Sequence, residues 1–160
     1  MHTRIATVQA TSGNAELGPA LLSFSPFLNG SPPDPCFALT PGSTAALVLD
    51  EQIGKLTYTG CATLALCRCT VTAGRDEAPF DAYELVIDHN GDAIGKPSGS
   101  QLQNGAQTLS LVNNADVTWS TERLVTLRDG DTLQPASASG GGASANVAGM
   151  TFTVELLGPP

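Results

Sequence analysis

The segment "CATLALCRCTVTA" at residues 61–73 constrains the fold more than any other stretch, because its side chains alternate in character with a period of two. Successive side chains of an extended strand point to opposite faces, so this period predicts a long β-strand. One face would carry Thr63, Ala65, Cys67, Cys69 and Val71, and the other Leu64, Leu66 and Arg68. Because the strand begins apolar on both faces, we expect the protein core to cover one face and a second body, such as a neighbouring subunit, to cover the other.

The same alternation recurs along the chain, and no segment has a convincing amphipathic helical pattern. Only 14% of residues are charged, while Gly (17) and Pro (11) are abundant, a composition that favours short strands joined by turns. In one strand, Tyr83, Leu85 and Ile87 would point inward and Glu84, Val86 and Asp88 outward. The sequence predicts an all-β fold, an antiparallel β-sandwich. Its expected strands lie at 3–10, 45–50, 54–60, 61–73, 82–88, 106–113, 115–137 (two strands that divide near 120–122, then a turn at 129–130) and 150–158.

The first 43 residues differ in character from residues 44–160, which we expect to form the sandwich domain. After the strand at 3–10, the segment 25–42 contains Pro26, Pro32, Pro33, Pro35 and Pro41. Proline lacks a ladder donor and fixes φ, so this segment predicts an extended, Pro-rich N-terminal arm with little regular pairing. It is either a surface connection or an arm that reaches a partner, anchored by large apolar residues: Phe24, Phe27, Leu28 and Phe37.

The charge balance limits the possible partners. The formal net charge is −8, and the two lysines, Lys55 and Lys96, with five scattered arginines do not make the basic face that nucleic acid requires. Anionic membrane surfaces are disfavoured for the same reason, and no apolar run reaches the roughly 20 residues that span a bilayer. The start of the chain does not have the build of a secretory signal, so we expect a soluble protein made in a cytoplasm.

Catalytic and metal-binding patterns are weak. The chain has two histidines, His2 and His89, and no Gly-x-Ser-x-Gly elbow that would present a nucleophile. The "CRC" pair at 67–69 has the wrong spacing for a zinc knuckle. Two disulfides are conceivable among Cys36, Cys61, Cys67 and Cys69, but reduced structural thiols are favoured in a cytoplasmic domain. We therefore expect no enzyme, no cofactor and no metal.

The run "DHNGD" at residues 88–92 admits two interpretations. Counted from Asp88, a calcium loop of the EF-hand type would need Gly and Glu where Ala93 and Gly99 stand. Asn90-Gly91 between alternating segments instead predicts a hairpin tip, because both central positions of that turn take positive φ. Asp88 would then cap the turn, and His89 or Asp92 would flank it in solvent.

From about residue 42 to 158, the order of segments resembles the jelly-roll domains of the tumour necrosis factor/C1q-like class, in particular those of bacteriophage virion proteins. The resemblance rests on the long strand at 61–73, "YELVIDHNGDAIG", "QTLSLVNNADVTWS", "RLVTLRDGDTLQPAS", a Gly/Ser-rich loop and the closing "MTFTVELLG". Aromatic residues are only 5% of the chain, fewer than in the mammalian members, which favours the phage side over receptor signalling.

The resemblance implies a homotrimer in which the inner sheets of three copies pack together, with Leu64 and Leu66 at the trimer interface. The function it implies is a capsid decoration (cementing) protein, located on the outer capsid surface of the virion, that binds the major capsid protein of a tailed phage. The capsid contact would be made by Ile5 and Val8, through β-augmentation, and by Phe24, Phe27 and Leu28. The alternative is a head-fibre or tail-tip module of the same fold that binds a receptor or glycan.

Overall fold

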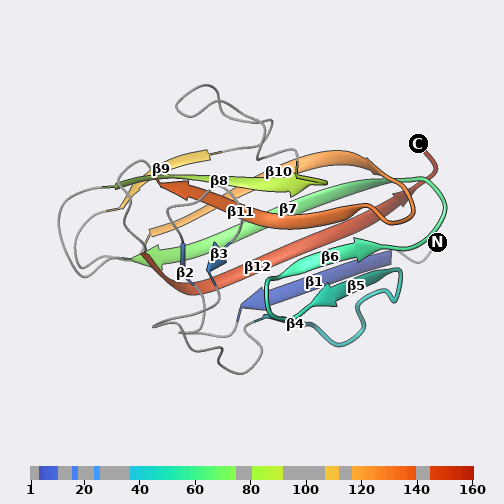
Figure 1. The fold of residues 1–160 in the computed structure, drawn as a ribbon, viewed down its shortest axis with the longest axis horizontal. Coiled ribbons are helices and arrows are strands. Elements are labelled where there is room, and N and C mark those ends of the chain that lie inside the picture. Colours follow the sequence, from blue (N-terminus) through green and yellow to red (C-terminus); the bar gives the residue numbers. More distant parts are fainter. Residues whose placement is uncertain are drawn as a thin grey trace.

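The computed structural model describes residues 4–10, 16–17, 24–25, 37–74, 81–91, 107–111, 117–139 and 145–160. Every regular element among them is a β-strand, and all strand pairs are antiparallel (Figure 1). The strands form two sheets that pack as a jelly-roll sandwich, as the alternation of residue types predicts.

The larger sheet has the strand order β10-β7-β12-β1-β4, and the short strands β2 and β3 extend it from β12. The smaller sheet has the order β5-β6-β11-β8-β9. The bounds in the larger sheet are Arg4–Ala10 (β1), Glu16–Leu17 (β2), Phe24–Ser25 (β3), Phe37–Leu39 (β4), Thr63–Gly74 (β7), Val117–Leu127 (β10) and Ala145–Gly158 (β12). Those in the smaller sheet are Leu47–Asp50 (β5), Lys55–Tyr58 (β6), Asp81–His89 (β8), Gln107–Leu111 (β9) and Thr132–Ser139 (β11).

The hydrophobic core lies between the two sheets and takes alternate residues from the strands of each. Its largest fully buried side chains are Phe37, Leu47, Leu56, Tyr58, Leu127, Leu133 and Phe152. Burial of side chains of this size contributes roughly 1.5–3 kcal/mol each, so the core is the main source of stability.

The N-terminal strand belongs to the sandwich. β1 pairs with β12 on one side, and on the other its residues Val8–Ala10 pair with β4. β4 lies within the segment for which the sequence predicted little pairing, and Phe37 is a fully buried core residue, not an anchor for a partner. The predicted division at residue 43 therefore does not separate two structural units, because a strand from each end of the first 43 residues completes the larger sheet.

Two other details differ from the sequence prediction. β10 runs without interruption from Val117 to Leu127, where a division near residues 120–122 was expected. Val86 and Asp88, which were expected to point outward, are nevertheless buried, at 2% and 8% exposure. Val86 packs with Ala136 in a small cluster on the face of the smaller sheet opposite the main core, so both faces of β8 are covered near its end.

Two of the connections that cross between the sheets, β6–β7 and β10–β11, are bound together at one end of the sandwich. Tyr58, at the end of β6, donates its backbone N–H to Asp131 and accepts at its carbonyl from Gly130 in the β10–β11 turn. Its hydroxyl donates to the carbonyl of Cys61 at 2.7 Å, and the N–H of Gly60 donates to the Asp129 carboxylate at 3.0 Å. These bonds fix the relative position of the strands that leave this end.

We expect Gly54→Ala to destabilise the fold more than Gly42→Ala. Both glycines have positive φ, which costs an L-residue about 1–2 kcal/mol. A Cβ at Gly54 would also lie 3.2 Å from the buried ring of Phe37, whereas a Cβ at Gly42 would have no atom within 4 Å. Forced repacking adds roughly 1–3 kcal/mol. Urea unfolding should show this difference, and equal losses for the two variants would contradict the packing at Phe37.

Candidate interaction surface

β7 has the two-faced character that its sequence predicts. Ala65, Cys67, Cys69 and Val71 have no exposed surface and face the core, whereas Leu64 and Leu66 lie partly exposed on the opposite side. Alternation along an extended strand produces this division. Leu64 and Leu66 therefore lie on the outer face of the larger sheet, the surface that faces away from the smaller sheet.

The register of the larger sheet extends this outer face across four strands. Leu124 of β10 is opposite Leu66, Leu66 is opposite Glu155 of β12, and Glu155 is opposite Ile5 of β1. Residues directly opposite each other in a sheet share a face, so these four form one row. Leu124 is 59% exposed and Ile5 is 38% exposed, large values for apolar side chains. Leu157, two residues beyond Glu155, is 45% exposed.

The outer face has two halves of different chemistry. We call the first the apolar half; it lies where β1 begins and β12 ends (Figure 1) and consists of Ile5, Leu64, Leu66, Leu124 and Leu157. Farther along the same strands lies a hydroxyl-rich half, which includes Thr70, Thr72, Thr118, Ser120 and Thr151. An ion pair at 3.0 Å between Arg68 and Glu122 separates the two halves. Exposed apolar side chains gathered on a flat face are typical of an interaction surface.

The sequence identified Leu64, Leu66 and Ile5 but missed Leu124 and Leu157. These two lie on strands that are distant in sequence from β7, and only the register brings Leu124 beside Leu66. Their alternation with buried neighbours such as Val125 and Leu156 was visible in the sequence, but it does not say which face of which sheet they share.

The residues proposed for a capsid-binding arm are not gathered in one place. Val8 is fully buried in the core, so its side chain offers no contact surface. β-Augmentation at β1 was also a wrong expectation. One edge of β1 pairs with β12, and the other pairs with β4 and, through the carbonyls of Ile5 and Thr7, accepts hydrogen bonds from the segment 40–44. The backbone of Phe24 lies in β3, and Phe27 and Leu28 lie outside the described residues.

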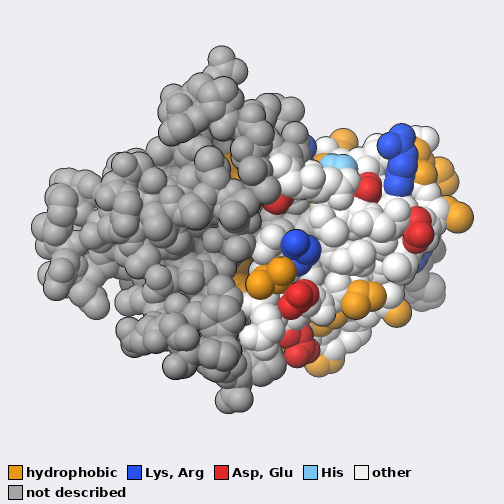
Figure 2. Space-filling model, viewed as in Figure 1, with side chains coloured by type: hydrophobic (Ala, Val, Ile, Leu, Met, Phe, Trp, Pro, Cys, Tyr) orange, Lys and Arg blue, Asp and Glu red, His pale blue; other side chains and the backbone are white. Residues whose placement is uncertain are grey.

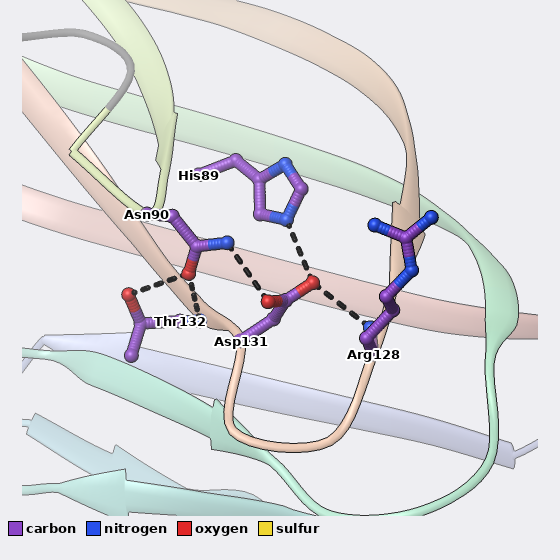
Figure 3. A network of polar contacts seen from close by, with 5 residues as sticks. All are labelled: His89, Asn90, Arg128, Asp131 and Thr132. Atoms are coloured by element: carbon purple, nitrogen blue, oxygen red, sulfur yellow. Dashed lines mark hydrogen bonds and ion pairs between the residues drawn. The ribbon is translucent and has the colours of Figure 1, made fainter.

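Asp131, in the β10–β11 turn, is the centre of a polar network that joins the turn to the end of β8 (Figure 3). Its carboxylate accepts hydrogen bonds from the Arg128 backbone N–H at 2.8 Å and from the Asn90 side-chain amide at 2.9 Å. The same carboxylate contacts His89 Nε2 at 3.2 Å. Asn90 Oδ1 in turn accepts from the Thr132 N–H at 2.8 Å. The side chains of Asn90 and Asp131 thus extend the pairing of β8 with β11 beyond its last strand residues.

The run at residues 88–91 therefore ends β8 at His89 and turns at Asn90 and Gly91, and this turn is braced against a second turn. Asn90 and Gly91 have φ values of 55° and 81°, the left-handed conformation that an Asn-Gly pair favours. The expected solvent position of His89 is wrong, since its side chain is only 19% exposed and contacts Asp131. The next described strand is β9, from Gln107, which pairs with the first half of β8, and Asp92 lies outside the described residues.

The network lowers the pKa of Asp131. Desolvation by itself raises this pKa, but the hydrogen bonds from Arg128, Asn90 and His89 and the charge of His89 outweigh that effect. A carboxylate whose pKa is lower in the folded state contributes stability above its unfolded pKa of about 3.9, and that contribution is lost as pH falls through the folded pKa.

The two cysteines of β7, Cys67 and Cys69, are buried, whereas Cys61 is exposed. Burial raises the pKa of the Cys67 thiol to about 12, against the opposing charge of Arg123, and burial also raises the pKa of Cys69. Cys61, Cys67 and Cys69 are free thiols, and Cys36 lies outside the described residues. Within the described ranges, no three His, Cys, Asp or Glu side chains gather as metal ligands would. The described part of the chain also contains no helix long and apolar enough to cross a membrane.

We expect Asp131→Asn to destabilise the protein by about 1–3 kcal/mol at pH 7, because hydrogen bonds to a charged group contribute this much. The difference from the native protein should shrink when urea unfolding is repeated near pH 3, because the contribution of the carboxylate declines as pH falls below the unfolded pKa of about 3.9. Glu51→Gln is the matched control, since Glu51 is exposed in the β5–β6 turn. A constant difference between pH 7 and pH 3 would contradict the role of the charge.

No protein-family model matches the sequence, and no curated protein matches it significantly. Among solved structures, Eiger TNF from S. frugiperda superposes with a TM-score of 0.56 at 11% identity, covering 100% of this chain and 96% of the other. GITRL of rabbit (TM-score 0.46, 18% identity, 96% of each chain) and of pika (0.42, 19%, 98% of each) are also similar. The superposition on Eiger TNF and the two antiparallel sheets show that the chain has a TNF-like jelly-roll fold.

Proposed function

We propose that the chain is a non-catalytic structural protein that forms a homotrimer through the outer face of its larger sheet. The observation that carries this proposal is the row in which Leu124, Leu66 and Ile5 lie side by side on that face, with Leu124 and Ile5 strongly exposed. Covering this apolar surface would stabilise an assembly by about 25 cal/mol per Å² of area removed from water.

Self-association is favoured because the apolar half fits a surface of the same kind. It lies on the open face of a sheet and has the Arg68–Glu122 pair beside it, so one copy offers another both apolar contacts and charges of either sign. Closed cyclic assemblies are the usual result when identical chains meet through such a surface. The resemblance to jelly-roll virion proteins favours three copies.

We further propose that the trimer is a capsid decoration protein of a tailed phage, bound on the outer surface of the virion to the major capsid protein. It would stabilise the shell by mass action, since contacts made only with the assembled lattice add free energy to that state. The formal net charge of −8 suits a protein that stays soluble and away from the genome. On the face drawn in Figure 2, the Lys and Arg side chains of the described residues stand apart and make no continuous basic patch.

The proposed lattice contact is the segment that holds Phe24, Phe27 and Leu28. Ile5 is reassigned from this contact to the trimer interface, because its exposed side chain shares a row with Leu66. Val8 is withdrawn, because it is buried in the core of the protomer.

We expect the native protein to have a mass near three times the 16.3 kDa of one chain in light scattering at micromolar concentration. Leu124→Asp should shift it toward the monomer, because a carboxylate would be buried against apolar neighbours. The matched control is Val48→Asp, since Val48 is 55% exposed on β5 of the other sheet. A native monomer, or equal effects of the two substitutions, would contradict assembly through this face.

We expect the trimer to bind empty capsids of its cognate phage saturably in co-sedimentation. Phe27→Asp and Leu28→Asp should weaken binding at least tenfold without changing the mass of the trimer, whereas Val48→Asp should change neither. Point substitutions are preferable to truncation here, because removing the first 40 residues would also remove β1 and β4 from the sheet. A trimer that does not bind capsids would contradict decoration and leave the receptor- or glycan-binding alternative.

A further inference from the structure

Glu155 is a single carboxylate inside the apolar half of the outer face. It lies on β12 between Leu66 of β7 and Ile5 of β1, its direct neighbours in the sheet, and Leu157 follows it on the same strand. Its surface is already partly buried in one copy. In the described part of the chain, the side chain of Glu155 makes no hydrogen bond or ion pair.

A surface that covers this row must provide a partner for the carboxylate. Burying an unpaired ion costs several kcal/mol, enough to cancel the gain from covering several leucines. A purely apolar partner would therefore be rejected, and a partner with a cation placed opposite Glu155 would be accepted. The carboxylate thus acts as a selectivity element within an otherwise permissive apolar face.

A second copy of this chain carries such a cation on the same face. Arg68 lies two residues along β7 from Leu66, with its side chain 57% exposed. Its Nε donates to Glu122 at 3.0 Å, which leaves the remaining guanidinium donors for another acceptor. Arg4, the nearest described cation on β1, lies on the opposite side of that strand from Ile5 by alternation and so is poorly placed for this role.

We infer that Arg68 of one copy pairs with Glu155 of the next across the interface, and that this pair selects a second copy as the partner of the apolar half. The inference rests on the proposed self-association through this face. In a cyclic assembly each copy gives its guanidinium to one neighbour and receives one from the other, so every interface holds the same pair. Arg68 then joins Glu122 of its own copy and Glu155 of the neighbour in one charged cluster.

The test is a double-mutant cycle in which trimer dissociation is measured by sedimentation of the full chain over a dilution series. Arg68→Gln should raise the concentration at which half of the trimer dissociates by at least tenfold, because it leaves Glu155 buried without a partner. The dissociation constant of a trimer scales with the square of that concentration, so this shift is equivalent to about 2.8 kcal/mol per trimer. The informative variant is Glu155→Gln. It should weaken assembly in the native background but strengthen it in the Arg68→Gln background, where it removes the orphaned carboxylate.

Two controls separate this pair from a general charge effect. Glu51→Gln removes a carboxylate and Arg128→Gln removes a guanidinium, both at exposed positions in turns outside the outer face. Neither substitution should weaken assembly in the native background and strengthen it in the Arg68→Gln background. Unfolding of the same variants below the dissociation concentration tests whether Arg68 and Glu155 pair within one copy.

The outcomes distinguish this inference from the proposed function. A native trimer in which Glu155→Gln has the same effect in both backgrounds overturns the pair and leaves self-association intact. Coupling that appears in the unfolding of the monomer, and not in dissociation, assigns the pair to a single copy and also overturns the inference. A native protein that stays monomeric overturns the proposed function and this inference with it.

Discussion

The structure depends on β7, which pairs with β10 and β12 on its two sides and buries every inward side chain from Ala65 to Val71. No other described strand combines such long ladders with such complete burial. Because its inner positions are small, the smaller sheet can approach closely enough for large residues such as Leu56 and Tyr58 to fill the space. The outward leucines of the same strand then become the centre of the exposed apolar face. The inward side chains of β7 therefore form part of the core, and its outward side chains form part of the proposed assembly surface.

The alternation of residue types was sufficient to predict the sandwich, most of its strands and the two faces of β7. The prediction failed where the local residue pattern favours one structure and the tertiary packing favours another. Prolines around β4 suggested an unpaired arm, yet Phe37 is buried deeply enough to hold that segment against β1. Val86 and Asp88 were predicted from the alternation to point outward, and the alternation within a single strand does not show that the outward face of β8 is also covered.

The candidate site was only partly visible for the same reason. Leu64 and Leu66 could be found because one strand displays its own two faces, but Leu124 joins them through a register that spans distant parts of the chain. The pairing of His89 with Asp131 was likewise hidden, since it depends on two turns that meet at the end of the sandwich. A short run such as residues 88–92 can suggest its local conformation, while its partners are set by topology.

The pairing of β1 with β12 has a consequence for how the protein is made. Arg4 lies opposite Leu156, so during synthesis β1 must wait for β12 before it gains its longest ladder. Until then β1 has only the short β4 as a partner in the larger sheet, and β7 has only β10. Folding through contacts so distant in sequence is slow, and it leaves strand edges open to other nascent chains. The interval between synthesis of β1 and β12 is therefore the period of greatest exposure to misassembly.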